Sequence, residues 1–197
     1  MKLIWESKPT LVIETGVAKG GSLLFACQML DLIYGADRRE RWRVIGCDVN
    51  SLDQAREVVE RFEYLNNVSF FHGDSASKDF RSFIETTISD YNSSRVLLSL
   101  DSNHTEEHVL AELNSLSHFV TIDSFIVVWD TRIGDLTRLT HLLRPRSWSR
   151  KKHAGTGVEK FMKNEGDLLG FVVESSMENE LIFTGVERSI LKRITRA

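Results

Sequence analysis

The sequence predicts an α/β fold in which helices cover both faces of a mostly parallel β-sheet. Apolar runs of strand length alternate with segments of helix length along the 197 residues, which is typical of parallel strands joined by crossover helices. Two of these runs, Val96–Leu100 and Phe125–Trp129, are apolar almost throughout, as expected for strands that are buried on both sides. The first run is followed by a glycine-rich turn and a new apolar segment, the pattern of a strand that leads into a helix.

The elements follow in a regular order. The first strand is expected at Thr10–Ile13 and its helix at Ser22–Tyr34. Further strand and helix pairs are expected at Arg43–Asp48 with Leu52–Phe62, Val68–His72 with Lys78–Tyr91, and Arg95–Leu100 with a helix from about Thr105 to Ser117. The fifth strand, Phe125–Trp129, precedes a basic loop, a helix near Gly157–Glu165 and two late strands at Gly170–Glu174 and Glu180–Gly185. Together they predict one three-layer α/β/α domain over residues 1–197, built on a seven-stranded sheet.

The composition is that of an ordinary globular protein, with 42% hydrophobic and 27% charged residues. A net charge of −3 gives no general electrostatic attraction for nucleic acid. Cys27 and Cys47 lie in apolar segments, which indicates buried, reduced thiols rather than a disulfide framework. The start of the chain turns polar at once, unlike a signal peptide, and no apolar run approaches the ~18 residues of a membrane span. A cytoplasmic protein without membrane or nucleic-acid partners is expected.

The turn after the first strand indicates a site for a nucleotide-type cofactor. Glycines such as Gly16 and Gly20 let the backbone approach a ligand, and the helix start at Ser22 presents free N–H groups. No Gly-Lys-Ser/Thr follows, and the glycine spacing is not that of the dinucleotide fingerprint. Glu14 would be a poor neighbour for a pyrophosphate and a good one for a cation. S-adenosylmethionine, which carries a sulfonium and an ammonium group, suits this turn better than NAD does.

Every one of the five successive strands ends in a carboxylate: Glu14, Asp48, Asp74, Asp101 and Asp130. Ligands of open α/β sheets bind outside the carboxyl ends of the strands, so these groups are expected at one edge. Each alone could be a helix cap, but five on one edge are harder to explain that way. A carboxylate at the position of Asp48 commonly binds a ribose diol. Asp74 and Ser75 could contact an adenine edge or cap the next helix.

Asp101 and Asp130 terminate neighbouring strands, so their oxygens could converge on a hard cation such as Mg²⁺. The alternative is that both are helix caps. His104 lies three residues after Asp101 and could take a proton from a substrate hydroxyl, although a loop histidine is more often only solvent-facing. His108, His118 and His141 are interpreted as helix-surface residues.

The strongest local charge feature is the basic stretch Arg144–His153. It is either a solvated surface loop or a lid that attracts a phosphate- or carboxylate-bearing substrate to the sheet edge. Its interleaved arginine and tryptophan are a weak sign of nucleic-acid binding in an acidic chain.

The assembled residues resemble the cephalosporin hydroxylase family of S-adenosylmethionine-dependent proteins. The resemblance covers nearly the whole chain. Its segments are Lys8–Gly16 with Gly20–Ser22, Leu100–Thr105 with His108–Leu110 and Glu112–Leu113, Val127–Thr131, and Leu191–Ile194. The segment Leu-Asp-Ser-Asn-His-Thr at 100–105 is quite specific. Family members are similar to class I methyltransferases, whose Rossmann-like, doubly wound sheet the resemblance implies here, and to Mg²⁺-dependent sugar O-methyltransferases.

The resemblance also implies roles for residues. S-adenosylmethionine would be held by the first turn and the next two strand ends, which gives the set Glu14, Thr15, Gly16, Gly20, Ser22, Asp48, Gly73, Asp74 and Ser75. Asp101 and Asp130 would bind the metal, and His104 would be the general base, with Asp101 beside it in the catalytic centre. Two features depart from the family. Trp129 stands where relatives carry a glutamate metal ligand, and the N-terminal segment that helps to close the site is expected to be short or missing.

The leading hypothesis is methyl transfer from S-adenosylmethionine to a hydroxyl of a sugar or another small natural product, assisted by Mg²⁺. A catalytically degenerate methyltransferase fold that only binds is the main alternative, because of Trp129 and the short N-terminus. A further alternative is an NAD(P)-dependent oxidoreductase, which would share this architecture. The glycine spacing after the first strand of this chain does not match the dinucleotide fingerprint of such enzymes. A hydroxylase is not supported, because the sequence shows no evident set of two histidines and one carboxylate that could bind non-haem iron. The sequence identifies neither the acceptor nor an oligomeric state, and a homo-oligomer is compatible with it.

Overall fold

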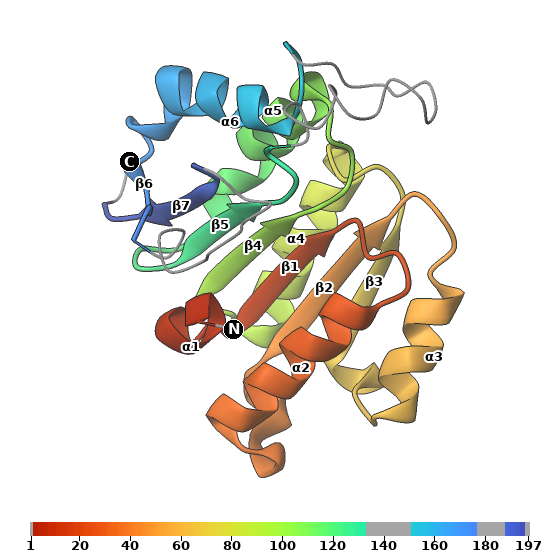
Figure 1. Ribbon diagram of the computed structural model, residues 1–197. Coiled ribbons are helices and arrows are strands. Elements are labelled where there is room, and N and C mark those ends of the chain that lie inside the picture. The colour runs from red at the N-terminus through yellow and green to blue at the C-terminus, as the bar shows by residue number, and fades with distance from the viewer. Residues whose placement is uncertain (1, 133–150, 177–187, 196–197) are drawn as a thin grey trace.

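The computed structural model describes residues 2–132, 151–176 and 188–195 (Figure 1). Its centre is a seven-stranded sheet with the strand order β3-β2-β1-β4-β5-β7-β6. The strands are β1 Leu11–Thr15, β2 Arg43–Asp48, β3 Val68–His72, β4 Val96–Leu100, β5 Phe125–Val128, β6 Phe171–Val173 and β7 Ile190–Arg193. β1 to β5 are parallel, and β7 runs antiparallel to both β5 and β6. The order reverses between β1 and β4, the switch point at which open α/β sheets bind ligands.

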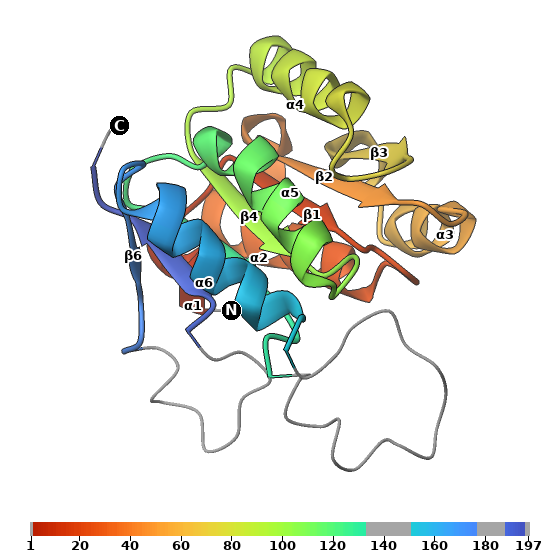
Figure 2. The same cartoon turned by 90° about the horizontal axis from the view of Figure 1, so that it is seen from above.

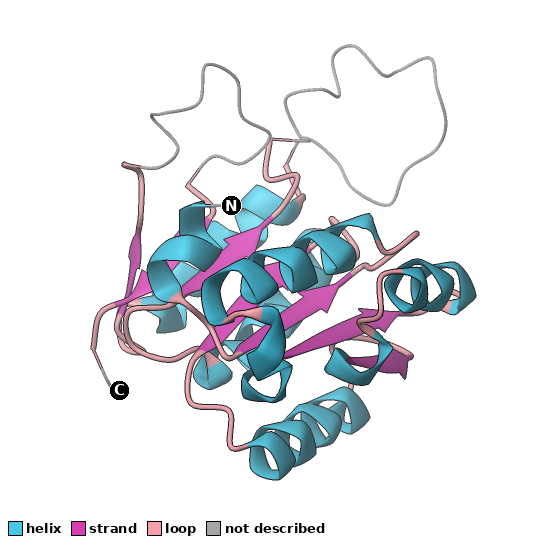
Figure 3. Ribbon diagram, turned by 90° about the horizontal axis from the view of Figure 1, so that it is seen from below, coloured by secondary structure: helices cyan, strands magenta, loops and turns pink. Residues whose placement is uncertain are grey.

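Helices cover both faces of this sheet. They are α1 Lys2–Ser7, α2 Gly21–Tyr34, α3 Asp53–Arg61, α4 Lys78–Tyr91, α5 Glu106–Leu116 and α6 Ala154–Phe161, the last continued by a π-helical turn at Met162–Gly166. α1, α2 and α3 share one face, and α4, α5 and α6 share the other, so that three layers result (Figures 2 and 3). Among the described residues, no helix combines the length and the apolar character needed to cross a membrane.

The side chains of β1 alternate between the hydrophobic cores on the two faces of the sheet. Leu11 and Ile13 are fully buried on the α4–α6 face, whereas Val12 is buried on the α2–α3 face. Successive side chains of a strand point to opposite sides, and all five residues of β1 are buried. The central strand is therefore apolar on both sides, and Glu14 necessarily enters the same layer as Val12.

The first five strands and the helices between them lie where the sequence predicted them, with shifts of a few residues at their ends. β5 ends at Val128 rather than at Trp129, because the chain turns there and Asp130 adopts a left-handed φ of 55°. The late strand expected at Glu180–Gly185 lies outside the described residues. The structure also has β7 at Ile190–Arg193, a strand that the sequence analysis missed, as it missed α1. Cys27 and Cys47 are buried and form no disulfide.

Candidate functional site

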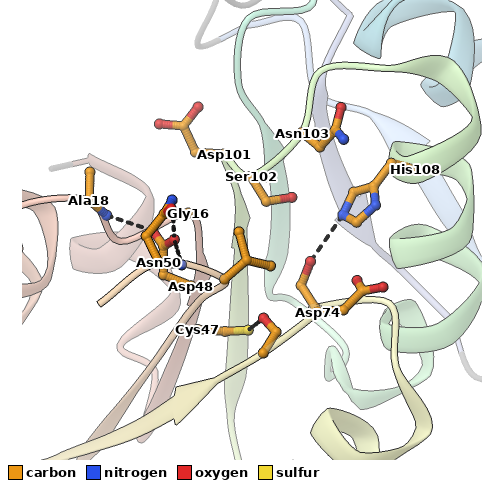
Figure 4. A pocket seen from close by; sticks show the side chains of 13 residues that line it. Gly16, Ala18, Cys47, Asp48, Asn50, Asp74, Asp101, Ser102, Asn103 and His108 are labelled. Carbon is orange, nitrogen blue, oxygen red and sulfur yellow. Dashed lines mark hydrogen bonds between the residues drawn. The ribbon is translucent and has the colours of Figure 1, made fainter. Parts of the chain in front are cut away.

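A cavity of about 470 Å³ opens at the carboxyl edge of the sheet, between the turns that follow β1, β2, β3 and β4 (Figure 4). Six of the residues predicted to bind a cofactor or metal line it: Gly16, Asp48, Gly73, Asp74, Ser75 and Asp101. They come from four separate strand ends, which the parallel order of the sheet brings together. We refer to this space as the first cavity.

The glycine turn brings β1 very close to the end of β4. Gly16 has a φ of 81°, and a Cβ atom placed on it would lie 2.0 Å from the carbonyl oxygen of Asp101. Only glycine fits a position that requires both a left-handed backbone and this approach. Gly20 has another role, since its missing Cβ would lie 2.7 Å from Cα of Ala55 and lets α2 pack against α3. Gly20 is not among the residues that line the first cavity.

Asp48 joins two of the turns around the first cavity. Its Oδ2 accepts a hydrogen bond from the backbone N–H of Ala18 at 2.9 Å. Its Oδ1 accepts from the backbone and side-chain nitrogens of Asn50 at 2.8 and 3.1 Å. The carboxylate thus holds the first turn against the second and keeps its remaining lone pairs at the cavity wall, where a ribose diol could donate to them.

The turn after β3 shows whether Asp74 or Ser75 caps the next helix, one of the two roles that the sequence left open. Asp74 accepts a hydrogen bond from the N–H of Ala76 at 2.9 Å, which stabilises the turn. The N-cap of α4 is Ser77, whose Oγ accepts from the N–H of Phe80 at 3.1 Å. Ser75 is therefore not the cap. Its side chain is buried and donates a hydrogen bond to the Glu112 carboxylate at 2.6 Å.

Glu14 and Ser22 line a second cavity of about 370 Å³, on the α2 face of the sheet. Glu14 is 4% exposed, and the Ser22 hydroxyl donates a hydrogen bond to its Oε1. Phe25, Ser99 and Trp129 also line this cavity, whose walls are otherwise apolar. The structure therefore brings Glu14 and Ser22 to the expected edge but not into the first cavity. Thr15 is fully buried and lines neither cavity.

Burial raises the pKa of Glu14 to about 7. The hydrogen bond from Ser22 partly opposes this rise, and the charge of Asp101 adds to it. The folded protein therefore binds this proton more tightly than the unfolded chain does. Below about pH 4.5 both states are protonated, and between about pH 4.5 and 7 the unfolded chain ionises first. Folding stability is consequently lost as the pH rises through this window.

Glu14→Gln cannot ionise and should escape that loss. We expect it to gain about 3 kcal/mol in the free energy of unfolding relative to wild type on going from pH 4 to pH 8. Urea denaturation at the two pH values measures this difference. Glu57→Gln, which changes an exposed glutamate of α3, should follow the wild type. Parallel pH profiles for Glu14→Gln and wild type would contradict the assignment.

Asp101, His104 and Asp130 form a cluster beside the first cavity, in which one ligand atom of each residue lies within 4.8 Å of the others. Nε2 of His104 is 3.5 Å from Oδ2 of Asp130. Burial raises the pKa of Asp101 to about 6, His104 opposes that rise, and Asp130 and Glu112 add to it. Two carboxylates that repel each other and an imidazole are donors that fit a divalent cation. The three predicted catalytic and metal residues are thus brought together.

Trp129 supplies no ligand to this cluster. Its indole nitrogen donates a hydrogen bond to Oγ of Ser99 on β4 at 2.9 Å, and the side chain is 44% exposed. An indole has a donor and no lone pair for a metal. Asp101 and Asp130 are therefore the carboxylates of the cluster, and water would have to complete the coordination of a hard cation.

The interpretation of three histidines as surface residues does not hold for two of them. His108 has a side chain only 20% exposed, lines the first cavity and contacts Ser75 and Glu112. His118 is partly buried and packs against Phe119. His141 lies outside the described residues. Sequence spacing could have revealed the position of His108. This residue lies near the start of α5 and four residues before Glu112, a spacing that places both side chains on one face of the helix.

Most of the basic stretch Arg144–His153 lies outside the described residues. Its last part has structural contacts, because Lys152 pairs with Glu107 at 3.0 Å and Nδ1 of His153 accepts from the N–H of Gly155 as the cap of α6.

Comparison with known proteins adds a family to this geometry. A family model described as Rhamnosyl O-methyltransferase/CmcI matches residues 1–194. The chain belongs to this family. The match confirms the resemblance to the cephalosporin hydroxylase family. A rhamnosyl O-methyltransferase of Mycobacterium leprae (strain TN) is 25% identical over 133 residues, which make up 68% of this chain and 53% of that relative. The chain spans about half the length of the curated relatives that it matches.

Solved structures of the rhamnosyl O-methyltransferase/CmcI type and of other methyltransferases share the fold. The apo structure of CmcI-N160 superposes with a TM-score of 0.59 at 16% identity, over 98% of this chain and 68% of that one. The MycE methyltransferase of the mycinamycin pathway, in complex with Mg, SAH and mycinamycin VI, superposes with a TM-score of 0.55 at 14% identity, over 98% and 46%. The Rossmann-like class I methyltransferase fold is thereby confirmed.

Proposed function

We propose that this protein transfers a methyl group from S-adenosylmethionine to a hydroxyl of a sugar or a similar small natural product. The observation that carries the proposal is the position of Asp101, which belongs both to the wall of the first cavity and to the cluster with His104 and Asp130. A cofactor-sized space and a proton-accepting centre thus share one residue. Methyl transfer to oxygen needs these two parts side by side.

The adenosyl part of the cofactor is assigned to the first cavity. Asp48 would accept hydrogen bonds from the ribose hydroxyls, and the turn Gly73–Ser75 would meet the adenine. The methionyl end would lie along the turn at Gly16 and Ala18, which lines the first cavity, and Glu14 and Ser22 would support this turn from the second cavity. Gly20 and Thr15 would support this turn through packing, as their positions suggest.

In the reaction, the acceptor oxygen attacks the methyl carbon, the new O–C bond forms as the C–S bond breaks, and S-adenosylhomocysteine leaves. His104 would remove the hydroxyl proton, and Asp130, 3.5 Å away, would stabilise the imidazolium that results. Asp101 would orient the acceptor from the other side of the cluster. A divalent cation, when bound by Asp101 and Asp130, would lower the pKa of the acceptor hydroxyl.

Two relatives support the finer parts of this proposal. The curated proteins that match the chain are rhamnosyl O-methyltransferases, which favours a sugar acceptor. MycE was solved with Mg and with a natural product, mycinamycin VI, which favours Mg²⁺ and a small-molecule acceptor. A degenerate protein that binds without catalysis remains the second candidate, because Trp129 occupies the place of a ligand and forms a hydrogen bond to Ser99 instead.

Calorimetry with S-adenosylhomocysteine, followed by methyl transfer to free and aryl rhamnosides, tests the proposal. We expect cofactor binding with or without metal, and turnover with Mg²⁺ that EDTA removes and fresh Mg²⁺ restores. Binding without turnover on any acceptor, and without response to Mg²⁺, would favour the degenerate protein. Absence of cofactor binding by a folded protein would overturn the proposal itself.

A further inference from the structure

A buried carboxylate links the two turns that border the far side of the first cavity. Glu112 on α5 is 0% exposed. Its Oε1 accepts a hydrogen bond from Ser75 at 2.6 Å and another from Ser102 at 2.7 Å. Ser75 follows β3 and Ser102 follows β4, so a single carboxylate oxygen fixes the distance between these turns. The other oxygen, Oε2, is buried and has no hydrogen-bond partner among the described residues.

His108 lies one helical turn before Glu112 and completes the group. Its Nε2 is 3.1 Å from Oγ of Ser75 and 3.6 Å from Oε1 of Glu112. The single hydroxyl hydrogen of Ser75 is already donated to Glu112, so its oxygen accepts from His108 and Nε2 carries a proton. The neighbouring Glu112 carboxylate raises the pKa of His108, burial opposes this rise, and the charge of Asp74 adds to it.

This histidine faces the ligand space and is not confined to the core. It lines the first cavity, and Figure 4 shows it together with Asn103 and Asp74 on one side, while Asp48 and Asn50 lie on the other. The two serine hydroxyls already give Oε1 of Glu112 two hydrogen bonds, so this oxygen does not need the imidazole, whose Nε2 lies 3.6 Å from it. Its fixed orientation leaves the ring and Nδ1 for a group in the cavity.

We propose that His108, oriented by Ser75 and Glu112, recognises the purine base of the adenosyl donor at this end of the first cavity. The inference depends on the proposed function, in which Asp48 holds the ribose. The base then lies between Asp74 and His108, and both accept a hydrogen bond from its exocyclic amine. The free oxygen of Asp74 accepts one hydrogen of that amine, and the unprotonated Nδ1 of His108 accepts the other. Hypoxanthine carries a carbonyl in place of that amine, so it offers no donor to either group and is rejected.

Three ligands distinguish base recognition from a general loss of structure: S-adenosylhomocysteine, S-inosylhomocysteine and 5′-methylthioadenosine, titrated calorimetrically into the full chain. Wild type should prefer the adenosyl over the inosyl compound by about tenfold or more. His108→Ala should bind S-adenosylhomocysteine about tenfold to a hundredfold more weakly, lose that preference, and bind methylthioadenosine more weakly by the same factor. Asn114→Ala, which changes an exposed residue of the same helix outside the first cavity, is the matched control, with wild-type affinity and preference for all three.

If the alanine variant does not fold, His108→Phe keeps a ring without a nitrogen acceptor and should also lose the preference for adenine. Either variant with the wild-type preference would overturn the inference, even if its affinities were uniformly lower. So would a wild type that binds both nucleosides equally well. A wild type that binds none of the three ligands would instead overturn the proposed function.

Discussion

His104→Ala should reduce the rate of methyl transfer by about 10²–10⁴-fold, the usual contribution of a positioned general base. Nε2 of His104 lies 3.5 Å from Asp130 and within the cluster that also contains Asp101. The side chain is not among those that line the first cavity. Its loss should therefore lower kcat and leave the affinity for S-adenosylhomocysteine nearly unchanged. Initial rates with a methylated product assay and calorimetry measure the two effects separately.

His72→Ala provides the control for this experiment. His72 is an exposed histidine at the end of β3 that contacts the carbonyl oxygen of Val49 and lies outside the cluster. We expect wild-type rates from it. An equal loss of turnover and cofactor affinity in His104→Ala would show that His104 acts in binding, and the role of general base would have to be abandoned.

Gly16→Ala should abolish cofactor binding and destabilise the fold. The added methyl group would lie 2.0 Å from the Asp101 carbonyl oxygen and 2.8 Å from Cα of Ser102, at a φ of 81°. Backbone atoms cannot rotate away as a side chain can, so the ends of β1 and β4 must separate. We expect a loss of at least about 2 kcal/mol in the free energy of unfolding, and S-adenosylhomocysteine affinity reduced by more than about a hundredfold, a change of nearly 3 kcal/mol.

Gly21→Ala is the matched control, five residues along the same turn. A Cβ atom there meets no other atom within 4 Å, and Gly21 is the first residue of α2. This variant should be as stable as wild type or slightly more so, because alanine favours a helix over glycine. Denaturant unfolding and calorimetry on both variants give the comparison. Wild-type binding by Gly16→Ala would refute the tight approach of the two strands.

The sequence was sufficient to predict the parallel part of the sheet and the position of its ligand edge. Alternating apolar segments located β1 to β5, and the carboxylates after them marked the carboxyl ends that the structure brings together. Asp101, His104 and Asp130 were predicted to converge, and they do. Each of these predictions depends on local periodicity and on the rule that parallel strands share an edge.

Side-chain direction and long-range pairing were harder to predict. Glu14 lies two residues after Val12 and therefore points to the α2 face, into the second cavity rather than the first. His108 looked like a polar residue of a surface helix, because only the packing of α5 against the turns after β3 and β4 buries it beside Glu112. β7 was missed because its short, partly charged segment gains strand character from its two neighbours in the sheet.

The place of β7 has a consequence for how the molecule forms during synthesis. Residue Lys192 pairs with Phe125, and Leu191 with Ile126, so the strand from Ile190 to Arg193 is inserted between β5 and β6 rather than added at the rim. Until that strand has left the ribosome, β5 has an open hydrogen-bonding edge that can pair with another nascent chain. The hazard of aggregation therefore persists until residues 190–193 have emerged and paired with β5.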